Sequence, residues 1–352
     1  MTHTRDHYII YGLLISGSLS IFILGFTYDL TTTVFGIKHS TFLLGLMFIS
    51  SFVGCTSSVL FMPYMRNYRE IYLVSYLVGE GLSGFLPSIV ALIQGVGNSE
   101  CKNITTNGVV EYTAVYAPPR FSIRLFFILL ATVLGLSFLA FVCLTKFRVA
   151  KGERVKLPAS TETLPTDMNA PPSYKTTSGW TMSKNNYMYL LVMMGAVCAL
   201  SNGILPSIQS YTCLPYGNVA YHLTVTLGSM AGPLAMCLGF VVKTPKVNLL
   251  SFLMVIVIIL SGALGYLAVQ SPSPPLQNSW FGTFLVVLVW IFVNGLTGFV
   301  KMGITTLFRP DPGRGMYYTG VATQIGSLVA AIIAFYLVNK AEIFEKYDQC
   351  KI

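Results

Sequence analysis

Glu80 is the residue of this sequence best placed to do chemistry inside a membrane. It stands near the middle of a 27-residue stretch, Ile71 to Gly97, that carries no other charge and is mostly apolar. A lone carboxylate at membrane depth costs about 2.5–3.5 kcal/mol even on the lenient insertion scales. A chain keeps such a group where a cavity, a partner or a substrate receives it. The stretch therefore predicts a membrane transporter, with Glu80 as its first candidate site residue.

A second polar group lies at a junction between two apolar stretches, from Asn202 to His222. Amides, hydroxyls and phenol rings suit a flat, uncharged, heteroaromatic ligand with hydroxyl groups, because rings stack on it and amides bind its edges. An outer loop with interfacial tyrosine anchors is a strong alternative for Tyr211 and Tyr216 and a weaker one for the amides. The candidate binding residues in this segment are Asn202, Gln209, Ser210, Tyr211 and His222.

Several other polar residues fall inside or beside apolar stretches. His222 lies about one turn into a stretch, where it suits either a proton carrier near neutral pH or a neutral hydrogen-bonding residue. Gln324 joins the substrate-binding candidates; like Asn294 and Thr297, it either lines a path or makes an ordinary interhelical hydrogen bond. Lys301 is expected at the inner end of its stretch, where snorkelling explains it.

Catalytic and cofactor motifs are missing from the sequence. It has no nucleophile–base–acid set, phosphate loop or metal-ligand spacing, so we predict neither an enzyme nor a cofactor. Gly79 to Gly84 matches the GxGxxG spacing, but that fingerprint needs a preceding strand in a soluble βαβ unit. Inside an apolar stretch, these glycines instead indicate close helix packing or a broken helix. Gly228 and Gly232 likewise indicate a packing surface.

The composition requires a bilayer to hold these residues. Charged residues are 10% of the chain, against about 25% in soluble domains. Hydrophobic residues are 54%, and the mean hydropathy is +0.67. Apolar spans of about 20 residues recur along the chain. We predict an all-α polytopic membrane protein with nine spans: Tyr8–Thr27, Thr41–Met62, Ile71–Gly95, Phe121–Leu144, Tyr187–Pro206, Tyr221–Val242, Leu249–Gln270, Trp280–Val300 and Tyr317–Val338.

The distribution of basic residues predicts the orientation. With a cytoplasmic N-terminus, the inner loops hold 15 Lys and Arg residues and the outer loops hold 7. This excess is what the positive-inside rule expects, so the net charge of +9 does not indicate a nucleic-acid partner. The C-terminus is then extracellular, and the sequon at Asn103 lies in an outer loop and predicts a glycosylated protein of the plasma membrane.

A polar segment divides the spans into two groups. Residues 147–186 are rich in Lys, Pro, Ser and Thr and predict a disordered cytoplasmic loop. Residues 1–146 then form a four-span bundle, residues 187–340 a five-span bundle, and residues 341–352 an extracellular tail. Such a division is typical of transporters that rock one half against the other. Within the loop, Pro171–Tyr174 has the Pro-Pro-x-Tyr form that binds WW domains, although a plain linker explains it too.

Three of the seven cysteines are expected outside the spans, in an oxidising compartment. They are Cys101, Cys213 and Cys350. Since three cysteines cannot all pair with one another, at most one internal disulfide forms among them.

Long blocks of the chain resemble the eukaryotic riboflavin transporter family. They are residues 55–63, CTSSVLFMP; 76–95, YLVGEGLSGFLPSIVALIQG; 202–217, NGILPSIQSYTCLPYG; and 219–223, VAYHL. The resemblance runs from about Tyr8 to Lys340. It implies sodium-independent uptake of riboflavin across the plasma membrane, sensitive to pH in some members. It also implies a fold similar to the major facilitator arrangement, with six spans before the loop and five after it.

The chain departs from the family pattern in two places. Gly54 stands where an acidic residue commonly precedes Cys-Thr-Ser-Ser, which weakens a simple proton-coupling mechanism. The chain also begins where the third span of the family would begin. A competing interpretation is therefore a truncated, non-transporting relative that binds partners or modulates a full-length carrier.

For a carrier, the chemistry of the candidates suggests separate roles. Glu80 would hydrogen-bond a ribityl hydroxyl or ring NH, or relay a proton. Asn202 and Gln209 would bind the ring edges, and Tyr211 would stack on the ring. Substrate would bind near the midplane, and access would alternate between the two sides of the membrane.

Overall fold

Long helices make up most of the protein, in a computed structural model that describes residues 3–34, 36–95, 99–106, 109–116, 118–155, 182–242, 245–311, 314–341, 343–348 and 350. Within these ranges, nine helices are long and apolar enough to cross a bilayer. The predicted all-α, polytopic membrane fold is confirmed. Pro171–Tyr174, the candidate WW-binding motif, lies outside the described residues.

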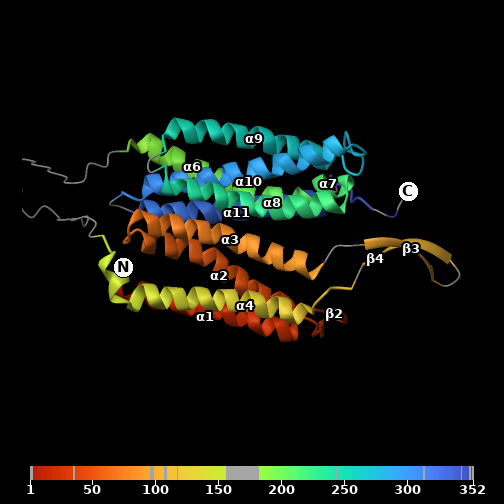
Figure 1. The fold of residues 1–352 in the computed structure, drawn as a ribbon, viewed down its shortest axis with the longest axis horizontal. Coiled ribbons are helices and arrows are strands. Elements are labelled where there is room, and N and C mark those ends of the chain that lie inside the picture. The colour runs from red at the N-terminus through yellow and green to blue at the C-terminus, as the bar shows by residue number, and fades with distance from the viewer. Residues whose placement is uncertain are drawn as a thin grey trace, which may run out of the picture.

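The helices fall into a first half and a second half, before and after the polar loop (Figure 1). The first half consists of α1 (His3–Thr27), α2 (Thr41–Met65), α3 (Glu70–Gln94) and α4 (Ile123–Lys146). The second half begins with four consecutive segments: α6 (Lys184–Ala199), the π-helix η1 (Leu200–Ile204), α7 (Leu205–Cys213) and the 3-10 helix η2 (Leu214–Tyr216). It continues with α8 (Asn218–Met236), the 3-10 helix η3 (Cys237–Phe240), α9 (Val247–Val269), α10 (Trp280–Phe308) and α11 (Gly315–Asn339).

Two of the predicted span ends are wrong. The fifth span was expected to end at Pro206, but helical structure continues to Tyr216. The eighth was expected to end at Val300, but α10 continues to Phe308. Polar residues in both extensions make hydrogen bonds within the helices, as when Thr305 Oγ1 donates to the Lys301 carbonyl at 2.8 Å. Such bonds satisfy the side-chain hydroxyls where the chain stays helical beyond the apolar run.

The two ends of the helix assembly carry different structures (Figure 1). At the end where α4 stops and α6 starts, the linker end, lies the short helix α5 (Arg148–Gly152). The opposite end, the hairpin end, carries two antiparallel hairpins: β1 (Thr32–Val34) with β2 (Ile37–His39), and β3 (Ser99–Thr106) with β4 (Val109–Tyr116). Asn103, the candidate glycosylation site, lies in β3.

A disulfide joins Cys101 of β3 to Cys350 near the C-terminus, across a sequence separation of 249 residues. The prediction of at most one internal disulfide among three cysteines is confirmed. The third cysteine, Cys213, is not in an outer loop as expected: it is buried at the end of α7. The bond places the hairpin and the C-terminal tail at the same end of the protein.

The start of the polar loop is ordered, which corrects the prediction of disorder for residues 147–155. After α5, a β-bridge pairs Arg154 with Tyr68, in the turn between α2 and α3. The Arg154 guanidinium donates to the Tyr68 hydroxyl at 3.2 Å, and this hydrogen bond raises the pKa of Arg154. Beside them, Arg69 and Glu153 form an ion pair at 3.1 Å. Residues 156–181 lie outside the described structure.

The helices hold together through close contacts between small residues. On α10, Gly298 lies so near α8 that a Cβ added there would stand 2.7 Å from the Gly232 carbonyl oxygen. On α3, a Cβ at Gly81 would stand 2.8 Å from the Pro233 ring of α8. Gly81 and the two glycines on α8 therefore serve helix packing, as predicted, because lipid gives helices little hydrophobic reason to associate. Gly79 and Gly84 have open space around them, so the packing prediction does not hold for these two.

Both halves contribute to a buried core at the linker end. That core combines Phe61, Tyr68 and Leu73 of the first half with Met194 and Phe308 of the second. At the hairpin end, the other core cluster comes from the second half and includes Ile208, Leu264 and Trp290. A hydrogen bond also crosses the halves at the linker end, where Arg309 Nη2 donates to the Tyr68 carbonyl oxygen at 2.8 Å. The two halves are therefore packed together most extensively at the linker end.

Candidate ligand cavity

A cavity of about 370 Å³ lies between the two halves. Its walls come from α2 and α3 of the first half and from α6, η1, α8, α10 and α11 of the second. Apolar walls are formed by Met62, Leu77, Met194 and Met236 together with several glycines. The polar residues that line it are Glu80, Ser83, Ser201, Asn202, Ser229, Asn294, Thr297, Lys301, Thr305 and Thr323.

Glu80 reaches this cavity from the middle of α3, and its side chain is accessible there. The Ser58 hydroxyl of α2 donates to Glu80 Oε1 over 3.5 Å, a long and weak bond. Tyr76 lies one turn before Glu80 on α3. The weak bond from Ser58 leaves the Glu80 carboxyl group open to a ligand in the cavity.

Asn202 reaches the cavity from η1, the π-helical turn between α6 and α7. π-Turns are rare and occur frequently at functional sites. The turn also packs tightly against α11, since a Cβ added at Gly203 would overlap the Ala330 side chain. Asn202 Nδ2 donates to Ser327 Oγ at 3.0 Å, and its Oδ1 accepts from Ser201 Oγ at 3.1 Å. The side-chain amide is therefore held in one orientation.

Lys301 is a cavity residue that the sequence reasoning missed. Its Nζ donates to Asn202 Oδ1 at 3.2 Å, so the ammonium points inward and does not snorkel. The snorkelling interpretation is wrong because α10 extends seven residues beyond Lys301 before it ends at Phe308. A signal was present in the sequence: residues 302–308 carry no charge, so Lys301 stands well inside an uncharged run.

Five of the seven predicted binding residues are not among those that line the cavity: Gln209, Ser210, Tyr211, His222 and Gln324. Tyr211 is buried at the hairpin end, and its ring packs 5.4 Å from that of Phe344 in the C-terminal tail. His222 packs beside the Tyr221 ring near the start of α8. The neighbour of Gln324 on α11, Thr323, does line the cavity. Of the seven, the structure brings together Glu80 and Asn202.

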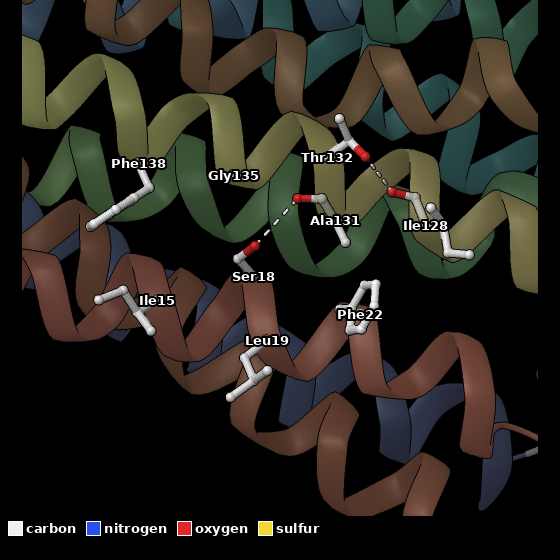
Figure 2. Close-up of a pocket in the computed structure, with 9 residues that line it drawn as sticks. All are labelled: Ile15, Ser18, Leu19, Phe22, Ile128, Ala131, Thr132, Gly135 and Phe138. Atoms are coloured by element: carbon white, nitrogen blue, oxygen red, sulfur yellow. Dashed lines mark hydrogen bonds between the residues drawn. The ribbon is translucent and has the colours of Figure 1, made fainter.

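A second hollow, of about 440 Å³, lies between α1 and α4 (Figure 2). Its lining is mainly apolar, and its two hydroxyls are already used. Ser18 donates to the Ala131 carbonyl at 3.3 Å, and Thr132 donates to the Ile128 carbonyl at 2.8 Å. A hollow without available polar groups offers a hydroxylated ligand no hydrogen bonds. The cavity between the halves is therefore the better candidate site.

A metal site would need several His, Cys, Asp or Glu side chains close together. No cluster of three or more His, Cys, Asp or Glu side chains that could hold a metal ion occurs within the described ranges.

The sequence also matches known proteins over almost its whole length. The family model for "Solute carrier family 52, riboflavin transporter" matches residues 1–346. The chain is 34% identical to riboflavin transporter member 3-A of Danio rerio, over 98% of this chain and 83% of that protein. It is 32% identical to member 3 of Homo sapiens over 98% of this chain and 84% of that protein.

A second human riboflavin transporter matches the chain to a similar extent. Member 2 of Homo sapiens is 33% identical over 90% of this chain and 75% of that protein. The family resemblance inferred from the sequence blocks is confirmed. Because the family model covers nearly the whole chain and relatives above 30% identity cover most of it, the chain belongs to solute carrier family 52, the riboflavin transporters.

Proposed function

We propose that the protein carries riboflavin across the plasma membrane through the cavity between its halves, by alternating access and without sodium. The observation that carries the proposal is this cavity, placed near the middle of α3 and lined by Glu80, Asn202 and Lys301. Family membership supports riboflavin as the substrate, because the relatives bear that name. No catalytic role forms part of the proposal, since members of a solute carrier family move their substrate unchanged.

The chemistry of the cavity suits this vitamin. Riboflavin presents ring carbonyl oxygens and a ring NH along one edge and a chain of hydroxyls on the other side. The Asn202 amide and the Lys301 ammonium can donate to the carbonyl oxygens, and Glu80 can accept from the NH or a hydroxyl. Glycines and methionines form the apolar walls that a flat ring needs. The volume of about 370 Å³ falls at the lower end of the usual range for ligand sites.

The packing of the halves supports alternating access. The shared core and the bond from Arg309 to Tyr68 close the linker end, while the hairpin end lacks a matching core among the described residues. With the N-terminus in the cytoplasm, the cavity would therefore open outward in this conformation. Transport would follow when the linker end separates and the hairpin end closes.

The experiment is uptake of labelled riboflavin by cells that express this chain, with surface delivery measured by biotinylation. Ser229→Trp should abolish uptake because the indole fills the cavity. Gly262→Trp is the control: it introduces the same indole side chain on α9, at an exposed position with no neighbour within 4 Å. Replacing sodium with choline should leave uptake unchanged. Background uptake at normal surface delivery would instead favour a non-transporting membrane protein that binds or modulates a full-length carrier.

A further inference from the structure

Among the described residues that line the cavity, two are charged, and they come from opposite halves. Glu80 lies on α3 of the first half, and Lys301 lies on α10 of the second. Each has a neutral hydrogen-bond partner of its own: Ser58 for the carboxyl group and Asn202 for the ammonium. No direct ion pair joins Glu80 to Lys301 in the described structure, although both side chains line the same cavity.

Two opposite charges facing one cavity have a simple consequence. With both side chains ionised, their charges cancel and the empty cavity is electrically neutral. Charges attract one another more strongly in a protein interior than in water, so each group compensates the other even without contact. Removing one partner leaves the other as an isolated charge at membrane depth, which is costly.

We propose that Lys301 is a specificity-determining residue: together with Glu80 it keeps the cavity neutral, so the protein selects an uncharged flavin over an anionic flavin ester. The inference rests on the proposed function and adds a selection rule to it. An uncharged flavin leaves the balance intact while it bonds to both side chains. A flavin phosphate brings close to two negative charges at neutral pH, which Lys301 attracts and Glu80 repels.

The rule predicts opposite effects for the two neutralising variants. Glu80→Gln leaves the Lys301 ammonium uncompensated. The Lys301 ammonium has three N–H donors and gives one of them to Asn202. The remaining donors can then bind a phosphate. Lys301→Met leaves the Glu80 carboxylate uncompensated, and the cavity then rejects anions more strongly. The double variant is neutral again and should return to the preference of the wild type.

The test is competition against uptake of labelled riboflavin by unlabelled riboflavin and by riboflavin 5′-phosphate. The readout is the ratio of the two half-inhibiting concentrations, phosphate over riboflavin. We expect Glu80→Gln to lower this ratio by about tenfold, since one like-charge repulsion is replaced by an uncompensated attraction. Lys301→Met should raise it, and the double variant should restore it. Asp29→Asn and Lys340→Met are matched controls at exposed positions beyond helix ends.

The outcomes separate the two proposals. Background riboflavin uptake by the wild type overturns the proposed function. Normal wild-type uptake with an unchanged ratio in Glu80→Gln overturns the selection rule. Where Glu80→Gln fails to reach the surface, the ratio is measured on purified protein by quenching of flavin fluorescence. Where Glu80→Gln binds neither flavin, Lys301→Met provides the test. A ratio of phosphate to riboflavin half-inhibiting concentrations no higher than that of the wild type contradicts the proposal.

Discussion

The polar side chains of the cavity differ in the hydrogen-bonding groups that they present. Asn202 presents an amide fixed by Ser201 and Ser327, and Lys301 presents a cation bonded to that amide. Glu80 presents an acceptor that takes a long hydrogen bond from the Ser58 hydroxyl. Because donors and acceptor lie on different helices, we expect a ligand with both kinds of group to contact both halves at once.

The first prediction concerns Glu80. Glutamine has the shape of a protonated glutamic acid, so Glu80→Gln at neutral pH should behave as the wild type does in acid, with a flattened pH profile of riboflavin uptake. Tyr76 and Lys301 remain as the other titratable groups near this position. The measurement is initial uptake between pH 5 and pH 8 at matched surface delivery, with Asp29→Asn as the control. Identical profiles for wild type and Glu80→Gln would remove Glu80 from the mechanism.

The second prediction compares two amide side chains, Asn202 and Gln324, that the sequence analysis both named as candidate binding residues. Asn202→Ala removes the acceptor of Lys301 and leaves the ammonium without that partner in the cavity, so uptake should fall by about tenfold or more. Gln324→Ala changes a residue of α11 that does not line the cavity, and uptake should change by less than about twofold. Initial rates at low riboflavin concentration test both variants. Equal losses in the two would contradict the assignment of the cavity.

At the scale of the helices, local irregularity positions the site. The π-turn η1 interrupts the helix formed by α6 and α7 at Asn202, and Gly203 lets it lie against α11. Elsewhere, glycines bring α8 close to α10 and to α3. These contacts place α3, η1 and α10 around one space. The cavity therefore depends on helix spacing as much as on the side chains that line it.

The third prediction tests that spacing. At Gly298, an alanine methyl would stand 2.7 Å from a backbone oxygen of α8, so Gly298→Ala must push α8 and α10 apart. Overpacking of this kind costs about 1–3 kcal/mol. The variant should show a lower melting temperature and lower surface yield. Gly262→Ala, on α9 with open space around it, is the matched control and should match or exceed the wild type, since alanine favours helix. Equal melting temperatures for the two variants would argue against close α8–α10 packing.

At the scale of the whole molecule, the halves differ in how they meet at the two ends. Buried residues of both halves meet at the linker end, and the start of the polar loop adds Arg154 against Tyr64 and Tyr68. Burial lowers the pKa of Arg309, and the charge of Glu70 opposes that shift. Since an arginine keeps its charge through such shifts, the bond to the Tyr68 carbonyl persists across physiological pH.

The fourth prediction tests this closure. Arg309→Met removes a bond between the halves at the linker end, so conformations open at that end should gain population. A cysteine introduced at Ser83, which lines the cavity, reports access from the outer solution. In a background with the five free cysteines replaced, a membrane-impermeant thiol reagent should label Ser83→Cys more slowly once Arg309→Met is added. Adding Lys340→Met instead is the control. Faster labelling with Arg309→Met would mean that the linker end is not the closed end.

Sequence reasoning succeeded where the physics is local. The nine spans follow from apolar runs of about 20 residues, because a bilayer demands a helix wherever such a run occurs. Glu80 was found because a carboxylate stands out in an uncharged run, and Asn202 because it lies in a polar segment beside a glycine and a proline. The family blocks added the identity of the family, which no single residue conveys.

Tertiary structure decided which polar residues share a cavity. Gln209, Ser210 and Tyr211 stand within nine residues of Asn202 in the sequence, yet the continued helix carries them toward the hairpin end and away from the cavity. Lys301, 99 residues from Asn202, bonds to it directly. The rotation and depth of each helix are set by contacts with helices distant in sequence. Hydropathy therefore determined which segments cross the membrane, and only packing between the halves determined what their polar side chains face.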